Sequence, residues 1–402
     1  MQRNDYKLFS QAKIANLALP NRLVRSATWD PSIIHSRRMT DEVLDLYREL
    51  ATGGVGLIIT GGFPVLEQDM LGGGGSGGRA CSYDDIQIEG IDRLAGVVHR
   101  SGTSCKIVAQ LEVGYLDAAP SAIPSPFLEE SVRPLSTAEI HQIVDCFVEA
   151  VVRMKDHGFD GVQLHAAHGG LLSSFLSPYT NRRTDEYGGS VENRARIVRQ
   201  IVSGAREKAG DFPILIKMNS TDYLEGGIDI DTFPELAREI ERSGIDAIEV
   251  SGGMWDCLVR SEGELGFRPV PAPESHTRIH SPDEQSYFLK YARRLDLDVP
   301  VILVGGNRDV ERLEEIVRQG AVDLIALCRP LISEPDLPNR WLQGRGSNTT
   351  DCISCNSCIH AMIVHPGRPA PGLVTCVFKH DKQQHKLAQE WLASWVGKNV
   401  VR

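Results

Sequence analysis

The sequence has neither a surplus of basic residues nor a long apolar run. Its 402 residues include 43 Lys and Arg against 53 Asp and Glu, which gives a formal net charge of -10 at pH 7. Binding surfaces for nucleic acids and anionic membranes need clustered cations, so this balance argues against both partners. No run reaches the roughly eighteen apolar residues of a membrane-spanning helix. The first residues contain no apolar segment or cleavage site of a secretory signal. We therefore expect a cytosolic protein that acts on a small molecule.

The sequence also lacks the even number of cysteines expected of a disulfide framework. Five of its nine cysteines are scattered singly, at Cys81, Cys105, Cys146, Cys257 and Cys328. The other four form the pattern C-x2-C-x2-C-x17-C near the C-terminus, at Cys352, Cys355, Cys358 and Cys376. Four thiolates that converge on a small site suit a 4Fe-4S cluster or a structural zinc ion. In a reducing compartment we expect a metal centre here more than disulfides.

What is present is the composition of an ordinary globular enzyme, with 42% hydrophobic and 24% charged residues. A chain of this length can bury a full-sized core. We expect one large domain over residues 1–340 and a Cys-containing extension over residues 341–402. The extension ends in a predicted amphipathic helix at 382–398, where Leu387, Leu392 and Trp395 share one face.

Short apolar runs rich in β-branched residues alternate with amphipathic helical stretches along the chain. Eight strands are predicted, at 22–27, 55–60, 106–111, 160–165, 213–218, 245–250, 300–304 and 322–327. Helices are predicted at 40–51, 85–101, 136–157, 190–209, 231–243, 282–294 and 309–319. This alternation predicts a parallel sheet covered by helices, either a closed (β/α)8 barrel or an open doubly wound sheet.

The positions of the polar residues separate these two folds. Nearly every predicted strand ends in a group suited to a ligand, among them Ser26, Thr28, Thr60, Gly61, Gln110, His165, His168, Lys217, Ser251, Gly305, Gly306 and Arg329. An open sheet concentrates its site at one switch point, whereas a barrel recruits all its strand ends. We therefore predict a (β/α)8 TIM barrel.

Paired glycines and an arginine at the ends of the last two strands predict a phosphate site. In such barrels the loops after strands seven and eight offer backbone N–H groups, here made approachable by Gly305 and Gly306. Arg329 adds a fork of donors for the same dianion, which favours a phosphate site over a bare turn with a surface arginine. The segment LGGGGSGGR at 71–79 also fits G-x-G-x-x-G. It follows no apolar strand and opens no helix, so we interpret it as a loop.

Six segments occur in the order found in the Old Yellow Enzyme family of FMN-dependent oxidoreductases. They are NRLVRSAT at 21–28, GGVGLIIT at 53–60, VAQL at 108–111, the segment at 161–194 that begins GVQLHAAHGG, IKMN at 216–219 and LCRP at 327–330. The chain from about residue 8 to about residue 340 resembles that family on these motifs. The resemblance implies a barrel that holds FMN without a covalent bond.

The resemblance also implies roles for individual residues in cofactor binding. The residues expected to bind FMN are Ser26, Ala27, Thr28, Gly61, Gln110, Lys217, Gly305, Gly306 and Arg329. Gln110 would contact the pyrimidine edge of the isoalloxazine ring. Lys217 would lie near N1 and O2, where a fixed cation stabilises the charge of the reduced flavin and raises its reduction potential.

His165 and His168 match the family's catalytic pair, which hydrogen-bonds the carbonyl or nitro oxygen of the substrate. Such bonds polarise a conjugated alkene and favour hydride delivery to its β-carbon. Gly170, however, occupies the position at which the family's His-x-x-(His/Asn)-x-Tyr motif carries a proton-donating tyrosine. Reduction of a plain enone therefore needs another acid or water.

Two further features concern the shape and chemistry of the predicted pocket. Tyr115, Tyr179 and Tyr223 are candidate acids by loop position. Trp29 stands where relatives carry Thr, Cys or His near the N5/O4 edge of the flavin, so we expect a pocket of different shape.

The first three residues of the cysteine group resemble the cluster ligands of trimethylamine dehydrogenase. The 2,4-dienoyl-CoA reductase type is similar, with one more residue before the third cysteine. The interval to Cys376 is several residues longer here than in those relatives. A 4Fe-4S cluster, a zinc ion and a metal-free knot therefore all stay open.

The sequence as a whole predicts an NAD(P)H:flavin oxidoreductase. It would pass hydride from NADH or NADPH, through FMN, to a conjugated carbonyl compound, an electron-poor alkene or a quinone-like substrate. The absent tyrosine keeps a flavin-dependent dehydrogenase or isomerase of a secondary metabolite open. The cysteines keep an electron-transfer module open, and a homo-oligomer also stays open.

Overall fold

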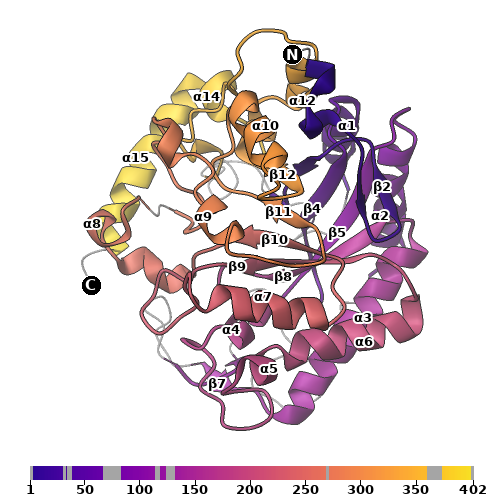
Figure 1. Cartoon of the computed structure of the whole chain (residues 1–402), viewed down its shortest axis with the longest axis vertical. Helices are drawn as coiled ribbons and strands as arrows, with labels where there is room; N and C mark the ends of the chain where they lie inside the picture. The colour runs from indigo at the N-terminus through magenta and orange to yellow at the C-terminus, as the bar shows by residue number, and fades with distance from the viewer. Residues whose placement is uncertain are drawn as a thin grey trace.

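Eight parallel strands close into a barrel at the centre of the molecule (Figure 1). This computed structural model describes residues 3–29, 33, 39–66, 83–113, 118–123, 132–268, 271–359 and 374–399. The barrel strands are β3 (Leu23–Arg25), β4 (Leu57–Pro64), β5 (Lys106–Glu112), β8 (Gly161–Ala166), β9 (Ile214–Asn219), β10 (Ala247–Ser251), β11 (Val301–Leu303) and β12 (Leu324–Leu327). Because β12 pairs with β3, the sheet closes on itself. The predicted (β/α)8 barrel is confirmed, and the open doubly wound sheet is excluded.

The described helices lie outside the barrel sheet, and several of them follow a barrel strand directly. They are α1 (Asp41–Thr52), α2 (Asp85–His99), α3 (Thr137–Asp156), α4 (Leu171–Leu176), α5 (Val191–Arg194), α6 (Arg196–Ala209), α7 (Phe233–Arg242), α8 (Glu262–Leu265), α9 (Leu289–Ala292), α10 (Val310–Arg318), α11 (Arg329–Ser333), α12 (Leu337–Leu342), α14 (Val377–His380) and α15 (Lys382–Asn399). Two-residue strands β6 (Ala118–Ala119) and β7 (Arg133–Pro134) form a separate small sheet.

Helix α3 illustrates how the sequence specifies these outer helices. The Ser136 hydroxyl accepts from the Glu139 N–H, and the Glu139 carboxylate accepts from the Ser136 N–H, which forms a capping box. Apolar residues at helical spacing, including Phe147 and Val151, are fully buried against the barrel. The capping box determines where the helix begins, and the apolar face determines which side of the helix packs against the barrel.

The amino-terminal end of the barrel is closed by a short antiparallel hairpin, β1 (Ala12–Ile14) and β2 (Leu17–Leu19). Ile14 of this hairpin packs in one apolar cluster with inward-facing strand residues such as Leu215 and Ile302. This end is therefore a filled core, and the opposite end of the barrel is left for a ligand.

The register of β4 against β5 shifts between Ile59 and Gly62. The Thr60 hydroxyl accepts from the Gln110 backbone N–H at 3.2 Å, and Gly62 then pairs with Gln110. A bulge of this kind re-aims the residues that follow it. It lies where β4 reaches the open end of the barrel.

Some predicted elements differ in the structure. The helix predicted at 282–294 is interrupted, because only a 3-10 turn at Pro282–Glu284 and α9 form, and Ser286 between them has a φ of 52°. The helix predicted at 190–209 is divided into α5 and α6 at Ala195. The predicted C-terminal helix is present as α15, and the glycine-rich segment 71–79 lies outside the described residues. None of the described helices is long and apolar enough to cross a membrane.

Replacement of Phe147 by Ala should lower the free energy of unfolding by about 3–5 kcal/mol, because the ring is fully buried between α3 and the barrel. Urea denaturation measures this loss. Glu149→Ala, an exposed position on the same helix, is the matched control and should change stability by less than about 0.5 kcal/mol. Equal effects of the two substitutions would contradict the packing described here.

Candidate active site

A cavity of about 490 Å³ opens among the carboxyl ends of the barrel strands. Its volume is in the range of small-molecule and cofactor sites. Of the predicted cofactor and catalytic residues, the structure brings into its wall Ser26, Ala27, Thr28, Gln110, His165, His168, Lys217, Gly305, Gly306 and Arg329. At the remaining predicted position, the Gly61 N–H faces the Tyr47 hydroxyl, and the bulge in β4 brings Gly62 into the wall instead.

A buried ion pair forms part of the cavity's base. Lys217 on β9 is 4% exposed, and its Nζ lies 3.3 Å from Oε1 of Glu249, which is fully buried on β10. Lys217 Nζ also donates to Ser26 Oγ at 2.9 Å, and the Ser26 hydroxyl donates to the Glu249 carboxylate at 2.6 Å. A lysine ammonium in this position is a fixed positive charge, and the carboxylate below it offsets the cost of burying it.

Two glutamines extend this network across the barrel. Gln110 Nε2 on β5 donates to Gln163 Oε1 on β8 at 2.8 Å, and Gln163 Nε2 donates to the second Glu249 oxygen at 2.7 Å. The side chain of Gln110 is thereby fixed, with its amide at the cavity wall. Such a chain of satisfied polar groups holds each side chain in one orientation.

The two predicted histidines lie side by side, with ring centroids 5.2 Å apart. His168 is held from two sides, because its backbone N–H donates to Asn219 Oδ1 and its ring Nε2 shares a 2.7 Å hydrogen bond with Ser251 Oγ. His165 Nδ1 is a buried atom with no hydrogen-bond partner among the residues described. A buried ring nitrogen without a partner is costly, and a polar ligand atom in the cavity would satisfy it.

Both imidazoles are held neutral. Burial, followed by the charge of Lys217, lowers the pKa of His165 to about 3. Burial also lowers the pKa of His168 well below its ordinary value, and the neighbouring His165 and Lys217 add to this effect. At neutral pH each ring therefore carries a single N–H and can donate it without bringing a charge into the site.

The other end of the cavity is built from backbone and an arginine. Gly305 and Gly306 have φ values of 103° and 71°, and a methyl group on either would overlap the ring of Tyr287. Their backbone therefore lies where a residue with a side chain does not fit. Arg329 lines the same end and is 8% exposed, with Nη1 donating to the His276 carbonyl and to Asn356 Oδ1.

Gly170 has no side chain at the position where the family carries its tyrosine. It lines the cavity with a φ of -61°, and a Cβ there would meet only ordinary or slightly tight contacts, at 3.3 Å or more. The backbone conformation at Gly170 is therefore one that a residue with a Cβ can adopt, and this position does not require glycine.

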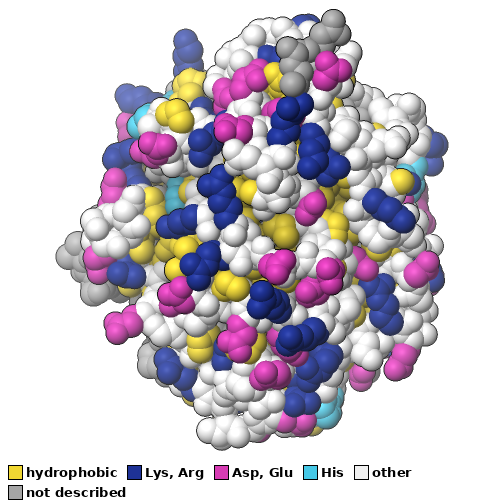
Figure 2. All heavy atoms as spheres, in the orientation of Figure 1, with side chains coloured by type: hydrophobic (Ala, Val, Ile, Leu, Met, Phe, Trp, Pro, Cys, Tyr) yellow, Lys and Arg dark blue, Asp and Glu magenta, His cyan; other side chains and the backbone are white. Residues whose placement is uncertain are grey.

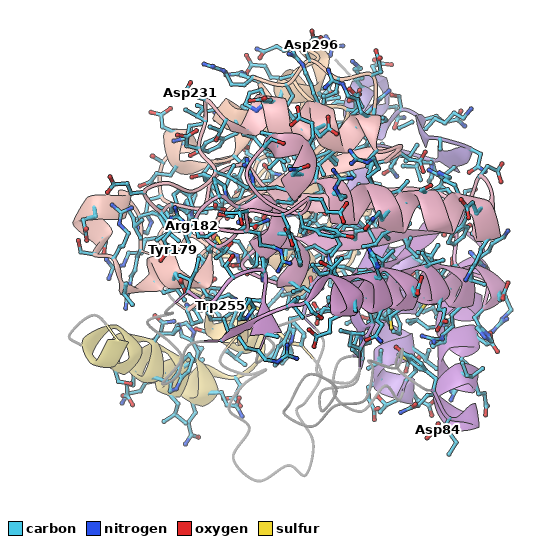
Figure 3. All side chains as sticks on the ribbon, turned by 90° about the horizontal axis from the view of Figure 1, so that it is seen from below. Asp84, Tyr179, Arg182, Asp231, Trp255 and Asp296 are labelled. Atoms are coloured by element: carbon cyan, nitrogen blue, oxygen red, sulfur yellow. The ribbon has the colours of Figure 1, made fainter. Side chains whose placement is uncertain are left out.

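The three tyrosines predicted as substitute acids do not supply one in the described part of the chain. Tyr179 and Tyr223 are not among the residues that line the cavity, and Tyr115 lies outside the described residues. Burial raises the pKa of Tyr179, and a hydrogen bond to Asp256 adds to the effect. Figure 3 shows Tyr179 beside Arg182, whose Nε donates to the Tyr179 carbonyl at 3.0 Å. Trp255, also labelled there, does line the cavity.

Three acidic residues that were not predicted from the sequence lie at this site in the structure. Glu249 lies beneath Lys217, and Glu112 and Glu274 line the cavity itself. The signal for Glu249 and Glu112 was a carboxyl group within or directly after an apolar strand, where a charged side chain is rarely buried without a purpose. Trp29, noted above, also lines the cavity and is 38% exposed.

All four cysteines of the C-terminal group line one small second cavity, together with Arg329 and Asn356. Cys358 lines both cavities. Burial raises the pKa of Cys358, and the neighbouring Cys352 adds to this effect. Among the described residues, no group of three or more His, Cys, Asp or Glu side chains is positioned to hold a metal ion.

Fold and cavity together define the class of protein. A (β/α)8 barrel whose strand ends carry a neutral histidine pair, a buried lysine, and a glycine and arginine pocket is a barrel oxidoreductase of the flavin-binding type. The chain belongs to the NADH:flavin oxidoreductase / NADH oxidase family, whose model matches residues 7–348. The resemblance stated from the sequence motifs is thereby confirmed.

Individual relatives agree with this assignment. An NADH oxidase of Thermoanaerobacter brockii is 33% identical over 368 residues, which are 87% of this chain and 52% of that protein. An NADPH dehydrogenase of Geobacillus sp. (strain WCH70) is 31% identical over 343 residues, 82% of this chain and 92% of that protein. A solved 2-naphthoyl-CoA reductase complexed with 2-naphthoyl-CoA is 25% identical with a TM-score of 0.73, over 88% of this chain and 54% of that one. The chain thus spans about half the length of the curated relatives it matches first.

The depressed pKa values predict that His165 and His168 do not titrate between about pH 5 and about pH 8. Their ring-proton signals, assigned in NMR spectra through the single substitutions His165→Ala and His168→Ala, should stay constant over this range. An unperturbed histidine changes charge near pH 6.5. A transition near that pH in either signal would contradict the neutral pair.

Proposed function

We propose that this chain is an FMN-dependent oxidoreductase that takes hydride from NADH or NADPH and reduces a conjugated carbonyl compound, an electron-poor alkene or a quinone-like substrate. The observation that carries the proposal is the orphaned, buried Nδ1 of His165 in a cavity that also holds His168 and Lys217. A substrate oxygen that accepts from both neutral rings satisfies that nitrogen. The family membership and the names of the relatives support the reaction class.

The residues in the cavity wall fit FMN from one end to the other. Lys217 and Gln110 suit the pyrimidine edge of the flavin, because a fixed cation and an oriented amide match its N1, O2 and N3. Gly305, Gly306 and Arg329 suit the phosphate, to which they offer approachable backbone and a guanidinium. When bound, FMN supplies the hydride-transfer chemistry that protein side chains lack.

The two histidines act on the substrate and not on the cofactor in this proposal. Hydrogen bonds from His165 and His168 to a carbonyl oxygen draw electron density from the conjugated C=C and hold the substrate in one orientation. They also stabilise the enolate oxygen as its negative charge develops. Because the rings are neutral donors, this assistance does not depend on pH through the ordinary range of histidine.

Two alternatives make different demands on the same residues. An oxidative dehydrogenation or isomerisation needs no acid for the α-carbon, so it accommodates Gly170. An electron-transfer module would use the cysteine site to pass electrons to a protein. The reductase is favoured because the polar groups of the histidine pair converge on a cavity of small-molecule size.

We also propose that Cys352, Cys355, Cys358 and Cys376 hold a 4Fe-4S cluster. All four line one cavity, and Ser354 and Asn356 between the first three have φ values of 54° and 58°, which turn the loop around that cavity. The C-x2-C-x2-C spacing favours the cluster over zinc. Buried thiols close together are costly to ionise alone, and a bound metal centre would offset this cost.

The proposed activity predicts that anaerobic protein with FMN is bleached by NADH or NADPH and is reoxidised promptly by 2-cyclohexenone. Stopped-flow absorbance of the flavin measures both steps. Reoxidation only by a protein acceptor would favour the electron-transfer module and contradict the reductase.

The double substitution His165→Ala, His168→Ala tests the role of the pair in the same experiment. It should abolish the long-wavelength charge-transfer band that a bound phenol produces, and slow reoxidation by the enone by at least about 100-fold. His141→Ala, an exposed position on α3, is the control for replacing a histidine. A phenol band that survives the double substitution would refute the assignment.

Anaerobically purified protein should contain iron and acid-labile sulfide in about equal amounts, on the order of four of each per chain. Cys355→Ser should lose most of both, whereas Cys105→Ser, a cysteine remote from the group in sequence, should lose neither. Zinc in place of iron would establish a structural zinc site, and absence of both metals would establish a metal-free knot.

A further inference from the structure

Glu112 is a carboxyl group at the rim of the cavity that the proposed reaction does not yet use. It is the last residue of β5, two positions after Gln110, and it lines the cavity together with Trp29 and His165. A methyl group on Gly62 would overlap the Glu112 carboxyl. The carboxyl therefore rests against the backbone that the β4 bulge brings into the cavity wall.

The Glu112 carboxyl has no hydrogen-bond or ion-pair partner among the residues described. By contrast, Glu249, which is fully buried at the base of the cavity, accepts hydrogen bonds from Ser26 and Gln163 and pairs with Lys217. A carboxyl without such donors is costly to keep charged in a protein cavity, so its protonated form is favoured. A protonated carboxyl carries an O–H that it can give to a ligand.

Glu112 lies in the same corner of the cavity as Gly170. The Leu171 N–H donates to the carbonyl of Val113 at 3.0 Å, so the end of β5 is tied to the start of α4. A Cβ on Gly170 would lie 3.3 Å from that same Val113 carbonyl oxygen. Gly170, which occupies the position of the family's tyrosine, therefore lies next to the backbone of Val113, the residue that follows Glu112.

Burial raises the pKa of Glu112 to about 7. The charged groups and histidines that share its cavity are His165 and His168 on the β8 side, Lys217 on β9, and Glu274, Arg308 and Arg329 at the far end. The other titratable side chains in the described wall are Tyr287, Cys328 and Cys358, which also lie toward that far end. Gly62, the residue of β4 against which the Glu112 carboxyl rests, has no titratable group. A raised pKa means that the protonated form is populated below about pH 7 and is lost as the pH rises through that value.

We propose that Glu112 is the acid that protonates the α-carbon of the substrate, in the place of the tyrosine that this chain lacks. The proposal rests on the proposed function. Transfer of hydride to the β-carbon of an enone moves the alkene electron pair onto the carbonyl oxygen, where His165 and His168 stabilise the enolate. The enolate then collapses, the Glu112 O–H bond breaks, and a C–H bond forms at the α-carbon. The carboxylate that remains regains a proton from water.

Glu274 is the competing acid within the cavity. Burial raises its pKa as well, but Lys217 and Arg329 oppose this effect. It lines the end that holds Tyr287 and the two glycines, and the Tyr287 hydroxyl donates to its backbone carbonyl. Glu274 therefore lies toward the proposed phosphate end, whereas Glu112 shares its corner with His165 and Gly170.

The test compares Glu112→Gln with the wild-type holoprotein, with Glu149→Gln on the exposed face of α3 as the matched control. Reoxidation of the reduced protein by 2-cyclohexenone should slow by about 100-fold or more in Glu112→Gln, because the amide cannot act as an acid. Reoxidation by a quinone should continue, because it forms no C–H bond from a proton. In the wild type, the rate with the enone should fall about tenfold per pH unit above about pH 7, and Glu112→Gln should lack this transition.

A measurement that does not depend on turnover accompanies the kinetics. Infrared difference spectra of the oxidised holoprotein should show a protonated carboxyl that titrates near pH 7 in the wild type and is missing in Glu112→Gln. Adding Gly170→Tyr to Glu112→Gln should restore part of the enone rate without the transition near pH 7, because an unperturbed tyrosine has a pKa near 10.

Equal enone rates and pH profiles in Glu112→Gln and the wild type would overturn the assignment of Glu112 and leave the proposed function standing. Loss of the transition in Glu274→Gln, and not in Glu112→Gln, would overturn it in favour of Glu274. Failure of the wild type to reduce the enone at any pH, with NADPH still bleaching the flavin, would overturn the proposed function and this proposal with it.

Discussion

The ion pair between Lys217 and Glu249 is the constraint on which the site depends. An ammonium group buried inside a barrel needs a compensating charge, and Glu249 supplies it from the neighbouring strand. Ser26 and Gln163 satisfy the same carboxylate, so β3, β8, β9 and β10 are joined by one polar network beneath the cavity. The network holds the Lys217 ammonium group toward the proposed flavin. The Glu249 carboxylate also partly offsets the positive charge of that group. The reduction potential of a bound flavin would therefore depend on Glu249 as well as on Lys217.

A second constraint is the local irregularity of the barrel wall. The bulge in β4 brings Gly62 beside Gln110 and leaves room against its backbone for the Glu112 carboxyl. At the far end, Arg329 contacts both the cavity wall and Asn356 in the cysteine segment, so the two proposed cofactor sites share a residue. Cys358 lines both cavities, and Ser354 and Ile359 also line the larger one, so this described part of the cysteine segment lies against the ligand end of the barrel. On the molecular surface, acidic and basic side chains are interspersed over the face shown in Figure 2.

The sequence predicted the barrel strands, which repeat along the chain, and the site residues that belong to a recognisable motif. Eight apolar runs predicted strands that are buried on both faces. The polar residues at the end of nearly every run predicted that these strands close into a barrel. The pair His165 and His168 was found because its spacing within one segment already implies proximity. Gly305, Gly306 and Arg329 were found because they follow two consecutive strands of a predicted barrel, whose ends lie side by side. The helix at 282–294 was predicted as continuous because its apolar spacing is helical, but Ser286 adopts a left-handed conformation that interrupts it. Gly61 was predicted in the wall because a one-residue bulge leaves no mark on an apolar strand pattern.

By itself, the sequence determined the fold class, the family and the types of residue that surround the ligand, since these follow from periodicity and local motifs. It also determined that the usual tyrosine is absent, because Gly170 can be read directly from the chain. Only the tertiary structure decided which carboxyl groups serve the site. Glu112 and Glu249 lie more than one hundred residues apart and look alike in sequence, as charges within or after apolar strands. Barrel closure places Glu249 under a lysine and leaves Glu112 facing the cavity without a described partner. Charge state depends on such surroundings and not on residue type alone.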